Sequence, residues 1–254
     1  ITHNLQNAID YLIFIEFVYA DDCVDKNFQL TTWDGTMFSF MPYDLDTTFN
    51  LWWDGSSYTN PEGEELSVVH SRNNVTSSST QFWDAFLDEY NEEIIERYND
   101  LKEKGIITVD NIYNLCTELT RKYGKDLYSK EYKKWPSIPS NSTIHTSVPQ
   151  ILDWCKDRIE WLDAHWAKLQ SLAINGESAI TGTSQYTFEV TPAGTYQNSV
   201  IWSIVDGNEY ATIGQDGVVT VLEGANENSV TIRATSKYNA SIYADKTITV
   251  TEQI

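Results

Sequence analysis

The chain has 254 residues, of which 41% are hydrophobic, a share that supports ordinary globular cores in two domains. Its 17 basic and 37 acidic side chains give a formal net charge of -20, so neither nucleic acid nor an anionic membrane is expected as a partner, because neutralising phosphates requires clustered lysines and arginines. No apolar run approaches the ~20 residues of a transmembrane helix, and three cysteines without a C-x-x-C pair predict neither a zinc site nor a disulfide framework.

The first predicted element is a helix over residues 2–20. Its apolar side chains recur at helical spacing, namely Leu5, Ile9, Leu12, Ile13 and Phe17. We expect this helix to be amphipathic or largely buried and to lead the chain into an acidic segment. Taken by itself, it reads as an ordinary core helix.

A β-hairpin is predicted next. Two β-prone runs, at 28–33 and 37–41, are joined by the pair Asp34-Gly35, which favours a tight hairpin turn. This turn lies near the middle of the segment 22–46. The two ends of that segment should therefore meet in space.

Four oxygen-bearing side chains flank the hairpin, and we call them the acidic corner: Asp22, Asn27, Asp44 and Asp46. Like charges held close together push each other toward the neutral form unless a cation or a proton relieves them. Oxygen ligands suit hard cations such as magnesium, manganese or calcium. The acidic corner therefore predicts a divalent-cation site, and the alternative is a polar turn without a ligand.

A long irregular loop is predicted over residues 51–80, which are dense in Gly, Ser, Asn and aromatic residues. Because it follows the acidic corner directly, it is a candidate lid or acceptor-recognition surface. Trp52, Trp53 and Tyr58 are available there for stacking, although such a cluster also suits ordinary packing.

Three helices are predicted after the loop, from apolar residues at helical spacing: 81–101, 109–123 and 150–169. Thr108 is the expected N-cap of the second helix. A link rich in Pro and Ser, at 136–149, precedes the third. Arg158 in that third helix is expected to pair with a carboxylate and fix the helix in place.

Near residue 170 the pattern changes to β-branched and aromatic residues that alternate with polar ones, with Gly, Asp and Asn turns roughly every 8–12 positions. This predicts an antiparallel β-sandwich with Trp202 in its core and a turn at Asp216-Gly217. The fold class is therefore α+β and multi-domain, with one domain over 1–169 and a second over 170–254.

Three runs of the first domain resemble the spore coat protein H (CotH) kinase family over roughly residues 1–168: IDYLIFIEFVYADDCVDKNFQL, FSFMPYDLDTTF and CKDRIEWLDAHW. The resemblance implies a mainly helical, kinase-like C-terminal lobe with a small hairpin. It also implies transfer of phosphate from ATP to Ser or Thr hydroxyls, with magnesium or manganese as the metal.

By the same resemblance, Asp22 takes the catalytic role. Asn27 is implied as a metal ligand, and Asp44 or Asp46 takes the role of the metal-binding Asp in the kinase Asp-Phe-Gly motif, so that all three contact the cofactor. Where the family has Phe-Gly, this chain has Phe49-Asn50.

A kinase site also needs a phosphate-covering loop and a Lys held by a Glu. The twenty-one residues before Asp22 contain no Lys, Arg or Gly. We therefore expect the chain to be the C-terminal part of a longer protein, without the N-terminal lobe, and to have little or no phosphotransferase activity alone.

The second domain resembles the bacterial immunoglobulin-like family of group 2 through five runs: VTP, VIWSI, YATIGQDGVVT, SVTIRATS and KTITV. The resemblance implies an extracellular or cell-surface protein whose partner is a protein substrate or a cell-surface component. The alternative function is a non-enzymatic surface, adhesion or glycan-binding scaffold, in which the acidic corner is a structural calcium site.

Overall fold

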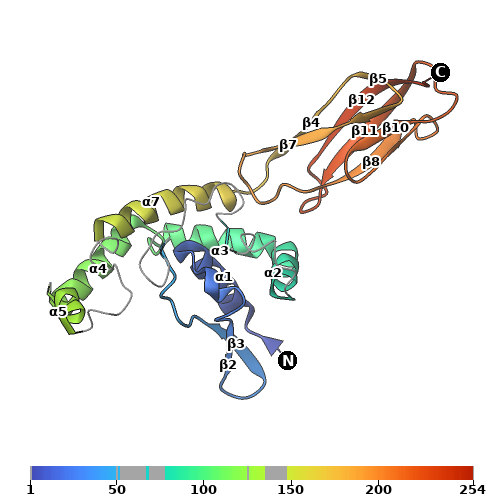
Figure 1. Ribbon diagram of the computed structural model, residues 1–254. Helices are drawn as coiled ribbons and strands as arrows, with labels where there is room; N and C mark the ends of the chain where they lie inside the picture. The colour runs from blue at the N-terminus through green and yellow to red at the C-terminus, as the bar shows by residue number, and fades with distance from the viewer. Residues whose placement is uncertain are drawn as a thin grey trace. The chain divides into compact units, whose positions relative to one another are not determined.

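The computed structural model describes residues 2–49, 51, 67–68, 78–124, 126–134 and 148–253. The chain divides into two compact units, Ile1–Asp163 and Ala164–Ile254 (Figure 1). Helices and β-sheets are both present, which confirms the α+β class. Most of the predicted loop at 51–80, with its Trp52, Trp53 and Tyr58, lies outside the described residues.

The first unit is mainly helical. Its elements, in chain order, are β1 (Thr2–His3), α1 (Leu5–Val18), a 3-10 turn (Asp21–Cys23), β2 (Gln29–Thr32), β3 (Met37–Met41), α2 (Ser78–Glu89), α3 (Asn91–Glu103), α4 (Val109–Tyr123), α5 (Leu127–Lys134) and α7 (Val148–His165). No helix within the described ranges is both long and apolar enough to cross a membrane.

Helix α1 is the central element of this unit. Its N-cap is Asn4, whose side chain accepts a hydrogen bond from the Asn7 amide and satisfies one of the free amides of the first turn. Four of the five apolar residues predicted for its core face are buried, and Leu5 at the start is 38% exposed. The predicted core helix is confirmed, with the exception of its first turn.

The predicted hairpin is also confirmed. Strands β2 and β3 pair antiparallel with Gln29 opposite Met41, and β1 adds to β3 in parallel, giving the sheet order β1-β3-β2. At the turn, Asp34 Oδ1 accepts hydrogen bonds from the amides of Thr36 and Met37. Gly35 has a φ of 74°, a left-handed conformation that glycine adopts without strain.

Aromatic packing fixes the hairpin to the helices. The rings of Tyr11, Phe28, Phe40 and Trp83 contact one another, with centroids 5.2–6.5 Å apart. Trp83 of α2 is fully buried and donates a hydrogen bond from Nε1 to the carbonyl of Val24 at 3.3 Å. The floor beneath the segment 22–27 is therefore built by α1, α2 and β3.

One helix prediction was wrong. The single helix expected over 81–101 is interrupted at Tyr90, which has φ -115° and ψ 27° between α2 and α3. Asn91 Nδ2 donates to the carbonyl of Asp88, so a side chain satisfies a carbonyl that the end of α2 leaves without a helical partner. The short helix α5 was not predicted, whereas α4 has the expected bounds and the expected cap, since Thr108 Oγ1 accepts from the Asn111 amide.

The second unit is built from strands. They are β4 (Ser171–Asn175), β5 (Ala179–Thr181), β6 (Thr183–Gln185), β7 (Thr187–Thr191), β8 (Val200–Asp206), β9 (Ala211–Ile213), β10 (Val218–Val221), β11 (Asn228–Ser236) and β12 (Tyr243–Thr251). They form sheets of order β4-β7, β6-β10-β9 and β5-β12-β11-β8, in which only the β5–β12 pair is parallel among the described strands.

Side chains from all three sheets share one core. Trp202 is 4% exposed and packs in this core with Val219, Ile232 and Ile248, as predicted. Gly217 has a φ of 80°, and a Cβ at this position would lie 2.4 Å from the carbonyl oxygen of Tyr186. The Asp216-Gly217 turn therefore requires glycine for both its conformation and its space.

Candidate functional site

Asp22 lies in the 3-10 turn that directly follows α1. Its backbone carbonyl accepts a hydrogen bond from the Asn27 amide at 2.7 Å, which closes the segment 22–27 on itself. Its carboxylate Oδ2 lies 2.8 Å from the Lys26 ammonium, and the Asp22 side chain is 19% exposed. The predicted catalytic carboxylate is thus held at the surface by a short, closed loop.

Asn27 joins the two ends of the hairpin. It is 7% exposed, and its Nδ2 donates to the backbone carbonyl of Asp44 at 3.5 Å. Nearby, the Cys23 thiol lies 3.5 Å from the carbonyl of Tyr43. The structure therefore brings Asn27 and Asp44 together, as the hairpin predicted.

Asp44 and Asp46 both present exposed side chains. Asp44 has a φ of 55°, a left-handed conformation that Asp tolerates better than most residues. Asp46 Oδ1 accepts a hydrogen bond from Thr47 Oγ1 at 3.3 Å. Two carboxylates thus stand on the return segment just beyond β3.

Lys26 is the residue of this site that the sequence reasoning missed. The pKa of its ammonium is raised, first by its hydrogen bond and ion pair with Asp22 and then by the charges of Asp44 and Asp46. The ammonium therefore lies in the field of all three carboxylates of the acidic corner. The available signal was the four-residue spacing from Asp22, at which opposite charges on one turn meet.

The donor set of the acidic corner suits a hard cation, because it consists of carboxylate and amide oxygens. In the described part of the chain, however, no three His, Cys, Asp or Glu side chains lie close enough together to hold a metal ion. Asn27 and either Asp44 or Asp46 remain the residues with the right chemistry to take one.

Cys23 is the thiol nearest to this site. It is 1% exposed, and its backbone carbonyl accepts a hydrogen bond from the Tyr11 hydroxyl at 2.8 Å. Burial, together with the nearby charges of Asp22 and Asp44, raises the pKa of the thiol. A buried thiol with a raised pKa is a poor nucleophile, so Cys23 packs rather than reacts.

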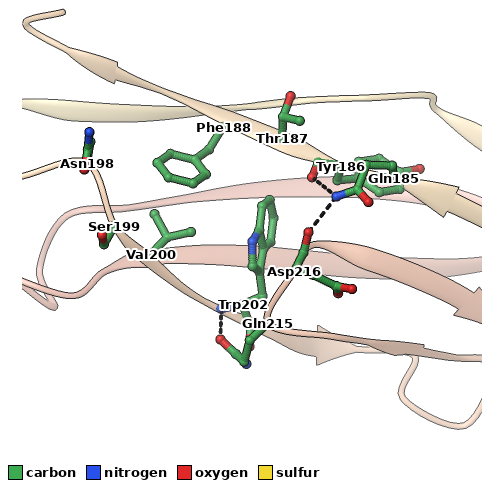
Figure 2. A pocket seen from close by; sticks show the side chains of 10 residues that line it. All are labelled: Gln185, Tyr186, Thr187, Phe188, Asn198, Ser199, Val200, Trp202, Gln215 and Asp216. Carbon is green, nitrogen blue, oxygen red and sulfur yellow. Dashed lines mark hydrogen bonds between the residues drawn. The ribbon is translucent and has the colours of Figure 1, made fainter. Parts of the chain in front are cut away.

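A cavity of about 400 Å³ lies in the second unit (Figure 2). Phe188, Val200 and Trp202 form its apolar middle. The Gln185 amide Nε2 at its edge already donates to the carbonyls of Tyr186 and Asp216. Tyr186 and Asp216 are the titratable residues in its lining, so this cavity offers no pair of carboxylates for acid-base chemistry.

Comparison with protein families places a match on the same part of the chain. A family model described as "CotH kinase protein" matches residues 3–162, which is more than half of the chain and includes the whole acidic corner. No curated protein matches the chain.

Proposed function

We propose that this chain, which belongs to the CotH kinase protein family, forms part of a protein kinase that transfers phosphate from ATP to Ser or Thr hydroxyls. The family match, which spans all four residues of the acidic corner, is the observation that carries this proposal. The contact between Asn27 and Asp44 supports it, because the two ends of the hairpin must meet for one site to use both.

In this proposal Asp22 is the catalytic residue. The ion pair with Lys26 requires an ionised Asp22, which is the form that accepts a proton from an acceptor hydroxyl. The closed loop from Asp22 to Asn27 and its aromatic floor hold the carboxylate in place. Such positioning is the main contribution that a protein makes to phosphoryl transfer.

Magnesium or manganese, bound together with ATP, would supply neutralisation of the phosphate charge. Asn27 and one of Asp44 and Asp46 are the residues that would hold it. Lys26 presents a positive charge to the same carboxylates, so it must give way to the metal or share the site with it.

We further propose that the second unit is an immunoglobulin-like module of group 2 and that the protein is secreted or attached to a bacterial surface. The shared core around Trp202 and the mainly antiparallel strands support this assignment. The partner would then be a protein substrate or a component of the cell surface.

One observation favours a second candidate function, a non-enzymatic surface or glycan-binding scaffold with a structural calcium site. Lys26 forms an ion pair with Asp22 and so offsets part of the negative charge of the acidic corner. A scaffold can keep this ion pair, whereas a kinase must release the Asp22 carboxylate to the acceptor hydroxyl.

The test uses the protein that contains this chain and measures transfer of phosphate from labelled ATP to Ser or Thr hydroxyls. Asp22→Asn should lower the rate about 10²- to 10⁴-fold, the usual contribution of a positioned acid-base group. Asp25→Asn, which changes a carboxylate of the same loop, serves as the control. Transfer by the Asp22→Asn protein at the unaltered rate would reject Asp22 as the catalytic residue, and absence of transfer by the unaltered protein would reject the kinase assignment.

A further inference from the structure

A fully buried ion pair lies behind the acidic corner. Arg158 of α7 and Glu16 of α1 are 2% and 1% exposed, and Arg158 Nη2 lies 3.0 Å from Glu16 Oε2. The guanidinium packs against the rings of Trp161 and Tyr19, 4.4 Å and 5.3 Å from their centroids. The predicted pairing of Arg158 with a carboxylate is thereby confirmed.

The guanidinium also binds the backbone of Glu16. Arg158 Nε and Nη2 donate to the Glu16 carbonyl at 2.8 and 2.5 Å. This carbonyl belongs to the last turn of α1, where it accepts from the Tyr19 amide at 3.3 Å in place of an amide four residues on, and where the helix dipole presents negative charge. Arg158 therefore caps the C-terminal end of α1 from within the core, and its planar fork is suited to binding two acceptors at once.

Both halves of the acidic corner depend on that turn of α1. On one side, Tyr19 has a left-handed φ of 54°, and the chain then enters the 3-10 turn that carries Asp22. On the other side, the amide of Phe49, three residues after Asp46, donates to the carbonyl of Val18 at 2.7 Å. One helical turn thus anchors the catalytic segment and the return segment together.

The Glu16 carboxylate reaches a further segment. Its Oε1 accepts a hydrogen bond from Ser67 Oγ at 2.7 Å, and its Oε2 accepts from the Val68 amide at 3.2 Å. Glu16 and Arg158 therefore connect α1, α7 and residues 67–68 at one buried point. Buried ion pairs are seldom stabilising relative to apolar packing, and in some proteins they serve to specify one arrangement of the segments that they join.

We propose that Arg158 and Glu16 are positioning residues for the acidic corner, which fix the last turn of α1 and so set Asp22 and Asn27 relative to Asp44 and Asp46. The catalytic part of this proposal rests on the proposed function. The geometric part can be tested on this chain without any transfer reaction.

The experiment compares Arg158→Lys with Arg97→Lys. Lysine keeps the charge at 158 but loses the fork that binds carbonyl and carboxylate together. Arg97 is a matched control, because it also ties α1 to another segment, through Asp10 at 2.7 Å, but away from the last turn. The readouts are the thermal transition, the amide NMR signals of Asn27 and Asp44, and the Kd for Mn²⁺.

We expect folded Arg158→Lys protein with shifted Asn27 and Asp44 signals and a Kd for Mn²⁺ raised about 10-fold or more, the usual effect of losing an outer-shell support. In Arg97→Lys the Kd for Mn²⁺ should stay within about twofold of the unaltered value, because this part-buried pair lies away from the last turn of α1. Folded Arg158→Lys protein with unchanged signals and unchanged Kd would overturn the proposal. If the unaltered chain binds no Mn²⁺, the metal assignment of the proposed function fails, and the amide signals alone decide on positioning.

Should Arg158→Lys fail to fold, hydrogen exchange of the unaltered chain decides instead. The amides of Tyr19, Asn27 and Phe49 should then exchange as one cooperative unit, because a single anchored turn holds all three. Exchange of Phe49 that is independent of Tyr19 would overturn the proposal.

Discussion

The side-chain amide of Asn27 donates a hydrogen bond to the backbone carbonyl of Asp44, at 3.5 Å, between residues seventeen positions apart. This contact joins the segment that ends α1 to the segment that leaves β3. It places Asn27, and with it the loop that begins at Asp22, against the return segment that carries Asp44 and Asp46.

Replacing Asn27 with Ala should therefore loosen the acidic corner. The lost hydrogen bond and the buried space left behind should cost about 1–2 kcal/mol, which corresponds to a fall in Tm of roughly 2–8 °C for a chain of this size. Binding of Mn²⁺ should weaken in the same variant, because an oxygen ligand is lost. Calorimetry and a Mn²⁺ titration check the two effects, and an unchanged Mn²⁺ affinity would remove Asn27 from the ligand set.

Replacing Lys26 with Met should tighten Mn²⁺ binding, because the ammonium competes for the carboxylates of the acidic corner. Lys104→Met is the matched control, since Lys104 forms a similar i,i+4 pair with Asp100 away from this site. Equal changes in the two variants would show that overall charge, and not the place of Lys26, sets the affinity.

The Lys26 contact also carries a pH dependence. The pKa of Lys26 is raised above its usual 10.5, mainly by the hydrogen bond to Asp22. The stabilisation that the Lys26–Asp22 contact provides is therefore fully present below pH 10.5. It is lost as the pH rises through the pKa of Lys26 in the folded state. Denaturant unfolding of the unaltered chain and of Lys26→Met should show a constant difference around neutral pH that shrinks only in strongly alkaline solution.

Gly217→Ala should destabilise the second unit strongly, because the new Cβ would lie 2.4 Å from the Tyr186 carbonyl oxygen in a left-handed backbone. Gly224→Ala isolates the conformational part, since Gly224 has a φ of 84° and no atom within 4 Å of its Cβ position. We expect Gly224→Ala to lower the free energy of unfolding by about 1 kcal/mol. Gly217→Ala should lower it by more than twice that amount. If denaturant unfolding shows equal losses of stability in the two variants, the close contact at Gly217 would be contradicted.

Local signals in the sequence predicted much of this fold. The Asp34-Gly35 turn, the Thr108 cap and the apolar spacing of α1 each depend on neighbouring residues, and each was found in the structure. The interruption at Tyr90 was missed, because the apolar spacing runs on through it and carries no signal of the side-chain hydrogen bond of Asn91 that accompanies the break.

The candidate site was predictable only in part. Asp22, Asn27 and Asp44 follow from their order around a hairpin, but the partner of Arg158 lies 142 residues away and no local pattern identifies it as Glu16. Helix α4 is a second example. The helical spacing of its apolar residues predicted the helix correctly, but that spacing does not show what the apolar face contacts, and none of the residues of α4 is buried.

The most direct test of the account is metal-dependent binding of ATP by the protein that contains this chain. Titration calorimetry with ATP in the presence of Mg²⁺ or Mn²⁺ should show saturable binding that EDTA abolishes and that a combined Asp44→Asn and Asp46→Asn substitution weakens. Absence of ATP binding, or ATP binding that is equal with and without metal and unaffected by those substitutions, would contradict the assignment of the acidic corner to phosphoryl transfer.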